Sequence, residues 1–299
     1  MSLPFIMALE GPTLLDQEKE FITEYQPWGI IHFARNIVEA KQIHELNREL
    51  RSHGIKHILV DQEGGRVQRL RAPEFTDYPA VQTYGDIARF DMANARSLVW
   101  NHYQQLGKEL SLLGFDINCA PVLDVQSTYT HDVIGNRSFS SDPWVVAELS
   151  SVACEAMRSC GIHPVIKHIP GHGRARHDSH VQLPEVTDDK SILFAHDFIP
   201  FREMRHEQYA MTAHVTFFAL DTEPVTHSAK VISYIRQQLG FRGLLMTDDL
   251  AMNALQGNLT ERAEFAARAG CDLLLFCEAD LGRCTDVADV ARNLMCHGH

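Results

Sequence analysis

The segment HPVIKHIPGHG, residues 163–173, joins a short apolar run to a turn rich in glycine and histidine. Apolar side chains at successive positions suit a strand that is buried on both faces of a parallel sheet. Lys167 and His168 then stand at the end of that strand. In barrels of parallel strands, side chains at this end of the strands carry the chemistry. The segment therefore predicts a buried strand that delivers two basic side chains to a site.

Seven other segments repeat the pattern of an apolar run followed by polar residues. They are residues 4–11, 28–35, 57–65, 115–124, 209–215, 243–250 and 271–278. Apolar residues at helical spacing occupy residues 38–54, 141–161, 228–240 and 259–270 between them. Ser141, Asp142 and Pro143 are typical of a helix start, and Ser228 and Thr260 are candidate N-caps. Eight strands alternating with helices predict an α/β fold, a single (β/α)8 barrel of the TIM type.

A doubly wound open sheet is the alternative fold. Such sheets normally have fewer strands, and no G-x-G-x-x-G follows a strand in this chain. No Pro- or Ser-rich linker divides the 299 residues. We therefore expect one catalytic barrel domain that covers residues 1–299.

The composition excludes several classes of protein. No apolar run approaches the ~18 residues of a membrane helix, and a net charge of −12 argues against a general nucleic-acid binder. The first residues, MSLPFIMALEG, lack a basic region and a cleavage site, so we expect a strand there, not a signal peptide. The seven cysteines include no C-x-x-C pair, which favours free thiols in a reducing cytoplasm over a zinc–cysteine site.

The ends of the predicted strands bring together acidic and basic side chains. If the strands form a barrel, these residues meet at one end of it. They are Asp61, Glu63, Lys167, His168, His214, Asp248 and Asp249. This convergence predicts a catalytic site better than any single motif does.

The motifs at these positions resemble a known family. VDQEGGRVQRLR (60–71), GNRSFSSDP (135–143), KHIPGHG followed by DSH (167–180), MTAHV (211–215) and TDDLAM (247–252) occur in the same order in it. The chain is similar to the single-domain bacterial β-N-acetylhexosaminidases of glycoside hydrolase family 3. The resemblance spans nearly the whole chain, and KH-x-PGHG-x4-DSH is its most specific signature.

The resemblance implies a role for each matching residue. Asp248 is expected to be the nucleophile that forms a glycosyl-enzyme ester. His180 matches the general acid/base. Asp178 is expected to orient the His180 imidazole and to favour its protonated form. The matches to sugar-binding residues are Asp61, Arg69, Arg137, Lys167 and His168. Gly171 and Gly173 suggest that the loop carrying Asp178 and His180 swings over bound sugar.

From the residues alone, plainer interpretations stay open. Asp248 could cap a helix that begins at DDLAMNAL, and His180 could be a solvated loop histidine. Asp61 and Arg69 could form only an ion pair, and Arg137 could only stabilise its loop. His214 is equally well a core histidine or a residue of the barrel mouth, and His172 is expected to support its loop.

We do not expect a metal site. His168 and His172 are four residues apart, but Pro170, Gly171 and Gly173 interrupt any helix there. The first strand ends in ALEGP, without the H-x-H of many metal-dependent barrel hydrolases. A metal-dependent hydrolase is therefore a less favoured alternative.

The expected function is that of a retaining β-N-acetylglucosaminidase without metal or organic cofactor. By resemblance, its substrates are cytoplasmic cell-wall fragments in which N-acetylglucosamine is linked to anhydro-muramic acid, with or without peptide. A phosphorylase that uses the same site is an alternative, because a histidine repels phosphate less than a carboxylate does. A sugar-binding protein without activity is another, which the intact Asp248, Asp178 and His180 disfavour. We expect a monomer whose partner is the sugar, with no nucleic acid and no membrane span.

Basic residues near the predicted strand ends suggest a positively charged rim. They are Arg66, Arg69, Arg71, Arg174 and Arg176. Such a rim on an acidic protein would favour an anionic substrate. The alternative is that these arginines are solvated and do not read the charge of the substrate.

Overall fold

The computed structural model describes residues 2–128, 130–175 and 183–297. Its main sheet has eight strands in the order β10-β1-β2-β3-β4-β5-β7-β9, and every pair is parallel. The strands are β1 Leu3–Ala8, β2 Pro27–His32, β3 His57–Val60, β4 Ile117–Asn118, β5 His163–Ile169, β7 Tyr209–Thr212, β9 Leu244–Met246 and β10 Leu274–Phe276. Each of the eight apolar segments contributes one of them.

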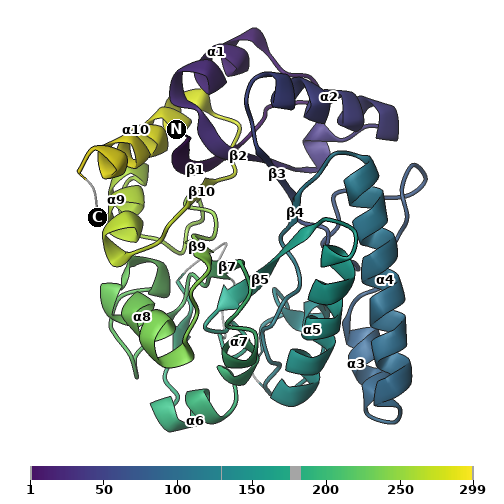
Figure 1. Ribbon diagram of the computed structural model, residues 1–299. Coiled ribbons are helices and arrows are strands. Elements are labelled where there is room, and N and C mark those ends of the chain that lie inside the picture. The colour runs from purple at the N-terminus through teal and green to yellow at the C-terminus, as the bar shows by residue number, and fades with distance from the viewer. Residues whose placement is uncertain (1, 129, 176–182, 298–299) are drawn as a thin grey trace.

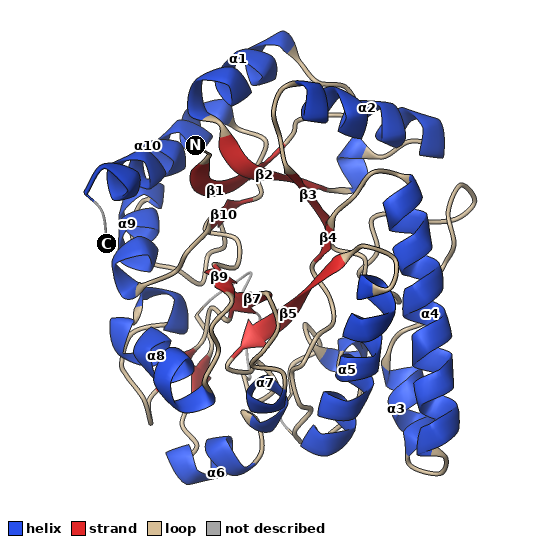
Figure 2. Ribbon diagram, viewed as in Figure 1, coloured by secondary structure: helices blue, strands red, loops and turns tan. Residues whose placement is uncertain are grey.

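The sheet closes on itself into a barrel. A parallel bridge joins Met246 of β9 to Leu273, and Thr247 N donates to the carbonyl of Leu273 at 3.0 Å. Figure 2 shows the strands around the centre, with the helices outside them. The predicted (β/α)8 barrel is confirmed, and the doubly wound alternative is excluded.

Helices occupy the connections between successive barrel strands (Figure 1). The α-helices are α1 Asp16–Tyr25, α2 Ala40–Ser52, α3 Gln82–Ala88, α4 Met92–Leu112, α5 Pro143–Arg158, α6 Lys190–Ala195, α7 Ile199–Glu203, α8 Ala229–Tyr234, α9 Leu259–Ala269 and α10 Leu281–His297. Short 3₁₀ turns are η1 Ala34–Asn36, η2 Gly135–Arg137 and η3 Val225–His227, and η4 Ile235–Leu239 is π-helical. All four predicted helical segments are found.

The predicted caps are correct at two helices and wrong at a third. The Asp142 side chain accepts a hydrogen bond from Trp144 N ahead of α5, and Ser228 Oγ accepts one from Val231 N ahead of α8. Thr260, in contrast, lies within α9. Asn258 caps that helix and forms a reciprocal capping box with Glu261.

The barrel interior is filled with apolar side chains that alternate with those facing the helices. Ile6 and Ala8 of β1 point inward, whereas Phe5 and Met7 belong to the core between sheet and helices. This alternation explains why the strand segments are apolar at almost every position. The interior set is Ile6, Ala8, Ile31, Leu59, Ile117, Cys119, Val165, Met211, Met246, Leu273 and Leu275. The barrel is thus a packed core, and its open space lies beyond the strand ends.

Several features were not predicted, among them helix α4. The segment DDLAMNAL, residues 248–255, forms turns and bends, so Asp248 is not a helix N-cap. A small parallel pair, β6 Glu185–Val186 and β8 Thr216–Phe217, lies outside the barrel sheet. Strands of two residues are too short to produce a periodic pattern.

No helix among the described residues has the length and apolar character needed to cross a bilayer.

Candidate active site

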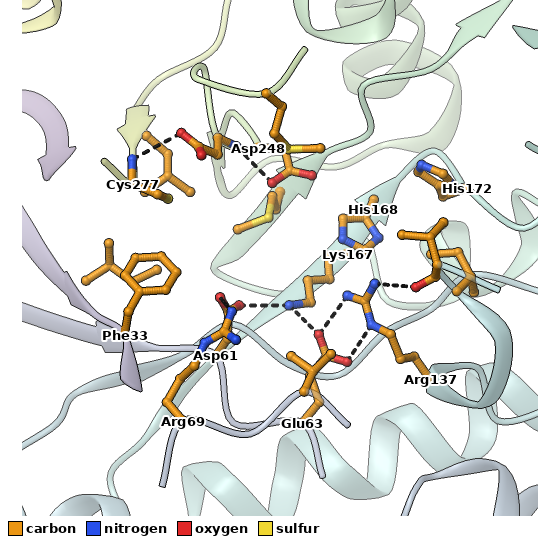
Figure 3. A pocket seen from close by; sticks show the side chains of 18 residues that line it. Phe33, Asp61, Glu63, Arg69, Arg137, Lys167, His168, His172, Asp248 and Cys277 are labelled. Atoms are coloured by element: carbon orange, nitrogen blue, oxygen red, sulfur yellow. Dashed lines mark hydrogen bonds and ion pairs between the residues drawn. The ribbon is translucent and has the colours of Figure 1, made fainter. Parts of the chain in front are cut away.

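A cavity of about 270 Å³ lies at the carboxyl ends of the barrel strands (Figure 3). Its walls come from segments that are far apart in the sequence. Phe33 follows β2, Asp61 and Glu63 follow β3, and Asp248 follows β9. The five predicted sugar-binding residues all line it: Asp61, Arg69, Arg137, Lys167 and His168. Asp248 lines the same cavity, so the structure brings together every described residue that was assigned a role.

One wall of the cavity is a network of ion pairs centred on Lys167. Its Nζ lies 2.9 Å from Asp61 Oδ1 and 2.6 Å from Glu63 Oε1. Arg137 donates twice to Glu63, through Nε and Nη2, each at 2.8 Å. Arg69 Nη2 completes the network at 3.0 Å from Asp61 Oδ2. The charges in this wall are therefore held in place before any ligand arrives.

The network keeps its carboxylates ionised despite their burial. Burial alone raises the pKa of Glu63, but the charges of Arg137 and Lys167 lower it to about 2. Lys167 and Arg69 likewise hold the pKa of Asp61 below its usual range against the effect of burial. Burial lowers the pKa of Lys167, and the two carboxylates reverse this and raise it above its usual value. The wall is thus charged at neutral pH, and it can offer both donors and acceptors to hydroxyl groups.

A β-bulge allows two consecutive residues to reach the cavity. The register between β5 and β7 shifts between Lys167 and Ile169, so His168 has no partner residue on β7. In a regular strand Lys167 and His168 would point to opposite faces, and bulges are known to redirect a side chain in this way. Both residues line the cavity as a result.

Asp248 faces the cavity opposite the ion-paired wall (Figure 3). Its Oδ1 accepts a hydrogen bond from Asp249 N at 2.8 Å. No ion pair to it is found among the residues that the structure describes. Burial raises its pKa, but His214, His168 and the hydrogen bond lower it below the usual value. Asp248 is therefore an ionised carboxylate that no neighbouring arginine or lysine in the described part of the chain neutralises directly.

His214 is a satisfied core residue that supports the Asp248 segment. It is fully buried, with Nδ1 at 2.7 Å from Thr226 Oγ1 and Nε2 at 3.0 Å from the Asp249 carbonyl. Because the carbonyl can only accept, Nε2 carries the proton in this contact. Of the two interpretations left open for His214, the core histidine is the one observed.

Some residues that line the cavity also make the structural contacts that the plainer interpretations predicted for them. Asp61 and Arg69 do form an ion pair, and Arg137 Nη1 does bind its own loop through the Val133 carbonyl at 2.9 Å. His172 supports its loop through its backbone N–H, and burial lowers its pKa to about 4.

Sequence reasoning missed three residues of the site. Glu63 was placed at the barrel mouth without a role, although it pairs with both Lys167 and Arg137. Asp124 was overlooked, although it ends the apolar segment FDINCAPVLD and binds His168. Phe33 follows β2 and carries the guanidinium of Arg69 over its ring, 5.1 Å from the centroid. The position at a strand end was the available signal for Asp124.

Of the described arginines of the predicted rim, Arg69 and Arg174 pair with carboxylates, whereas Arg66 and Arg71 are exposed and bind backbone carbonyls. Arg66 donates to the carbonyls of Val133 and Ile134, and Arg71 to those of Gln68 and Arg66. Arg174 is paired with two carboxylates, at 2.6 Å from Asp197 Oδ2 and 3.0 Å from Asp188 Oδ1. Arg176, the fifth arginine of the predicted rim, lies outside the described residues. The predicted acid/base His180 and its partner Asp178 lie outside them as well.

Within the described ranges, no group of three or more histidine, cysteine or acidic side chains has the geometry of a metal site. An ionised carboxylate at a strand end, facing a wall of fixed hydrogen-bonding charges across a small cavity, is the arrangement of a barrel enzyme acting on a polyhydroxylated substrate. Residues 6–297 match the model of the glycosyl hydrolase family 3 N-terminal domain. The chain belongs to glycosyl hydrolase family 3, and it is a glycoside hydrolase.

Individual relatives agree with this assignment over most of the chain. A beta-hexosaminidase of Alkalilimnicola ehrlichii is 38% identical over 283 residues, which are 92% of this chain and 80% of that protein. The crystal structure of NagZ from Neisseria gonorrhoeae in complex with N-trifluoroacetyl-D-glucosamine superposes with a TM-score of 0.88 at 33% identity. That match covers 97% of this chain and 89% of NagZ. A family 3 β-N-acetylglucosaminidase from Paenibacillus sp. also gives a TM-score of 0.88, at 32% identity, over 98% of this chain and 57% of its own.

Proposed function

We propose that this protein is a retaining β-N-acetylglucosaminidase that removes a terminal N-acetylglucosamine through a covalent intermediate on Asp248. The observation that carries the proposal is the position of Asp248, an ionised carboxylate without a described ion-pair partner that faces the charged wall. The names of the relatives support N-acetylglucosamine as the sugar. We further propose that the barrel by itself forms the complete site.

In the first step, a carboxylate oxygen of Asp248 attacks the anomeric carbon. The bond from that carbon to the leaving oxygen breaks, and the leaving oxygen takes a proton from His180. Asp178 would orient His180 and stabilise its charged form. The lowered pKa of Asp248 supports the nucleophilic role, because only the ionised carboxylate can attack.

In the second step, water attacks the anomeric carbon of the glycosyl-aspartate. His180 removes a proton from the water as the new bond forms, and Asp248 leaves as a carboxylate. Two displacements at one carbon return its original configuration. The sugar is released as the β-anomer, and both residues regain their starting state.

The charged wall would bind the hydroxyl groups of the sugar. Asp61 and Glu63 can accept from hydroxyls, and Lys167, Arg69 and Arg137 can donate to them. Since each of these charges already has a partner, sugar binding requires little further ordering of side chains. The cavity is near the lower end of the ~300–1,000 Å³ of small-molecule sites, which supports recognition of one terminal ring.

We propose cell-wall fragments as the natural substrates, with anhydro-muramic acid, with or without peptide, as the leaving group. This places the enzyme in peptidoglycan recycling in the cytoplasm, as a monomer that needs no cofactor. The test compares purified wild-type enzyme on N-acetylglucosaminyl-anhydro-muramic acid and on chitobiose. A preference for chitobiose would contradict this choice of leaving group.

The basic activity is tested with two aryl glycosides that differ only at C2. We expect 4-nitrophenyl β-N-acetylglucosaminide to be hydrolysed with a kcat/KM at least ~100-fold above that of 4-nitrophenyl β-glucoside. Equal rates would contradict the proposed sugar specificity. Running the reaction with and without inorganic phosphate distinguishes hydrolysis, which releases free N-acetylglucosamine, from phosphorolysis, which releases its 1-phosphate.

The covalent intermediate is tested by trapping. A 5-fluoro-N-acetylglucosaminyl fluoride keeps the 2-acetamido group, slows both steps through its ring fluorine, and retains a good leaving group for the first step. We expect the mass of the fluorosugar on the peptide that contains Asp248. Fragmentation that places the sugar on Asp249 would show that the other aspartate is the nucleophile.

A further inference from the structure

Asp124 is a buried carboxylate that contacts two residues of the cavity, His168 and His172, and both of its oxygens accept hydrogen bonds. It has no exposed surface. Its Oδ2 lies 2.7 Å from His168 Nδ1. Its Oδ1 accepts from the backbone N–H groups of His168 at 3.2 Å and of His172 at 2.7 Å. One side chain thus holds the imidazole of a cavity residue and both ends of the turn that carries it.

This contact determines where the proton of His168 resides. Burial raises the pKa of Asp124, but the neighbouring His168 and the hydrogen bonds lower it below the usual value, so Asp124 is an ionised acceptor. A carboxylate can only accept from Nδ1, and Nδ1 therefore carries a proton whether the ring is neutral or charged. The other nitrogen, Nε2, is left for the cavity that His168 lines.

We propose that Asp124 is a positioning residue that keeps a proton on His168 Nδ1 and thereby presents Nε2 to the sugar. Asp124 does not touch the substrate. It acts through His168, in the way that a buried carboxylate sets the tautomer of a catalytic histidine in hydrolase triads. The inference rests on the proposed function in one respect, namely that His168 contacts the sugar.

The Asp124→Asn variant separates the tautomer from the packing. An amide has one accepting oxygen, and the two backbone N–H groups require it where Oδ1 now lies. The NH₂ group would then face His168 Nδ1, which can meet it only by giving up its proton and accepting. The hydrogen bonds to the turn are therefore retained, while the proton of neutral His168 moves from Nδ1 to Nε2. The sugar would then meet the other tautomer of His168.

The readout specific to this inference is ¹⁵N NMR of the imidazole nitrogens. The chain has 17 histidines, so the His168 signals are assigned by their absence from His168→Gln. In the wild type we expect a protonated Nδ1, and in Asp124→Asn a bare Nδ1 and a protonated Nε2. A wild-type His168 whose only proton is on Nε2 would overturn the inference, whether or not the variant folds.

The kinetic readout is kcat/KM on 4-nitrophenyl β-N-acetylglucosaminide. We expect Asp124→Asn to lower it by roughly 10–100-fold, the loss expected for a hydrogen bond that involves a charged group. In the His168→Gln background the same substitution should change it less than about threefold, because Asp124 acts through His168. A full additional loss in that background would mean that Asp124 acts on the turn instead.

Asp116→Asn is the matched control, because Asp116 precedes β4 whereas Asp124 lies in the loop that follows it. Asp116 is also a carboxylate that accepts a backbone N–H, from Ile58 at 2.8 Å, and pairs with a cation, Arg51, but it does not line the cavity. We expect less than a twofold change in kcat/KM.

Failure of the inference about Asp124 and failure of the proposed function give different results. Wild-type kcat/KM in Asp124→Asn would overturn the inference and leave the proposed function intact. Absence of hydrolysis by the wild type would contradict the proposed function, and the NMR experiment would still decide whether Asp124 sets the tautomer of His168.

Discussion

Asp248 and Asp249 are adjacent carboxylates with opposite surroundings. Asp248 faces the cavity near two histidines that lower its pKa. Burial raises the pKa of Asp249 to about 6, and its Oδ1 accepts from Ala251 N at 3.0 Å and Cys277 N at 3.1 Å. These backbone contacts tie the turn after β9 to the segment after β10. The environment thus suits Asp248 for nucleophilic attack and Asp249 for a structural role.

Asp248→Ala should lower kcat on the aryl N-acetylglucosaminide by about 10³-fold or more, because the nucleophile acts mainly in the transition state. Binding of free N-acetylglucosamine, measured by calorimetry, should change less than about tenfold. Added azide should restore turnover and give the α-glycosyl azide, since it attacks from the face that the carboxylate has left. A variant that keeps a tenth of the wild-type rate would contradict the assignment.

Glu63→Gln should weaken both stability and sugar binding. Arg137 would lose its doubly bonded carboxylate and Lys167 one of two partners, leaving buried cations incompletely paired. Removing one member of a buried ion pair costs about 3–5 kcal/mol, and the remaining amide oxygen offsets part of that. We expect a loss of roughly 2–4 kcal/mol in urea unfolding at pH 7, with a raised KM.

The control for Glu63 is Glu148→Gln, which removes an exposed carboxylate paired with Arg96. Exposed pairs contribute about 0–1 kcal/mol, so this variant should unfold almost like the wild type. Equal losses in the two variants would show that burial of the Glu63 network adds nothing.

Residues of the site were predictable where they stand at strand ends, and their partners were not. Asp61, Lys167 and Asp248 follow or end apolar segments, so the barrel rule places them together. The contact from Glu63 to Arg137 spans 74 positions, and that from Asp124 to His168 spans 44. A local sequence pattern cannot predict contacts between residues so far apart in the sequence, and only the fold brings these residues together.

At the scale of elements, the turn after β5 packs tightly on the loop after β4. A Cβ on Gly173 would lie 1.7 Å from the carbonyl oxygen of Val125. The Gly173 carbonyl also accepts from Ser127 Oγ at 3.2 Å. The same loop holds Asp124, so this contact aligns the turn that bears His172 with its buried carboxylate.

Gly173→Ala should therefore separate the two loops. Overpacking of this kind costs about 1–3 kcal/mol, and the displaced turn should lower kcat/KM by roughly tenfold or more. The loss of stability is measured by thermal unfolding, and the loss of kcat/KM is measured on the aryl glycoside. Gly11→Ala is the control, since its Cβ would meet nothing within 4 Å. Wild-type activity in Gly173→Ala would show that the turn is free to move.

Elements were predictable where burial leaves a regular apolar pattern. All eight predicted barrel strands and all four predicted helical segments were found, because burial on both faces or on one helical stripe leaves a repeated pattern. Helix α4 was not predicted, although it has 21 residues. The DDLAMNAL segment has helical spacing, but it forms turns, and Asp249 within it accepts hydrogen bonds from Ala251 N and from Cys277 N after β10. At α9, Thr260 and Asn258 are both good capping types, and the reciprocal contact with Glu261 favours Asn258.

At the scale of the whole molecule, burial of neutral histidines makes stability depend on pH. His32 ends β2 and is fully buried, with Nε2 at 2.7 Å from Asn47 Oδ1. Asn47 uses its NH₂ group to donate to the Leu113 carbonyl, so its oxygen accepts and His32 Nε2 carries the proton. Nδ1 is buried and has no hydrogen-bond partner among the residues that the structure describes. A second proton would place an unpaired charge in the core.

Burial accordingly lowers the pKa of His32 from its usual 6.5 to about 4. Between these values the unfolded chain binds more protons than the folded one, so stability falls as the pH falls. The contribution of His32 is complete above about pH 6.5 and decreases as the pH approaches 4. From pH 8 to pH 5 the loss is roughly 2 kcal/mol. His102 and His172, with pKa values lowered to about 3 and about 4, act in the same direction.

His32→Gln should flatten this dependence, because its amide keeps the donor to Asn47 and cannot titrate. We expect the free energy of urea unfolding to fall by roughly 1–2 kcal/mol less between pH 8 and pH 5 than in the wild type. The comparison uses the change with pH, because loss of the ring packed against Phe115 lowers stability at every pH. His206→Gln, at an exposed position, should keep the wild-type dependence. Equal pH dependence in wild type and His32→Gln would mean that His32 does not contribute to acid unfolding.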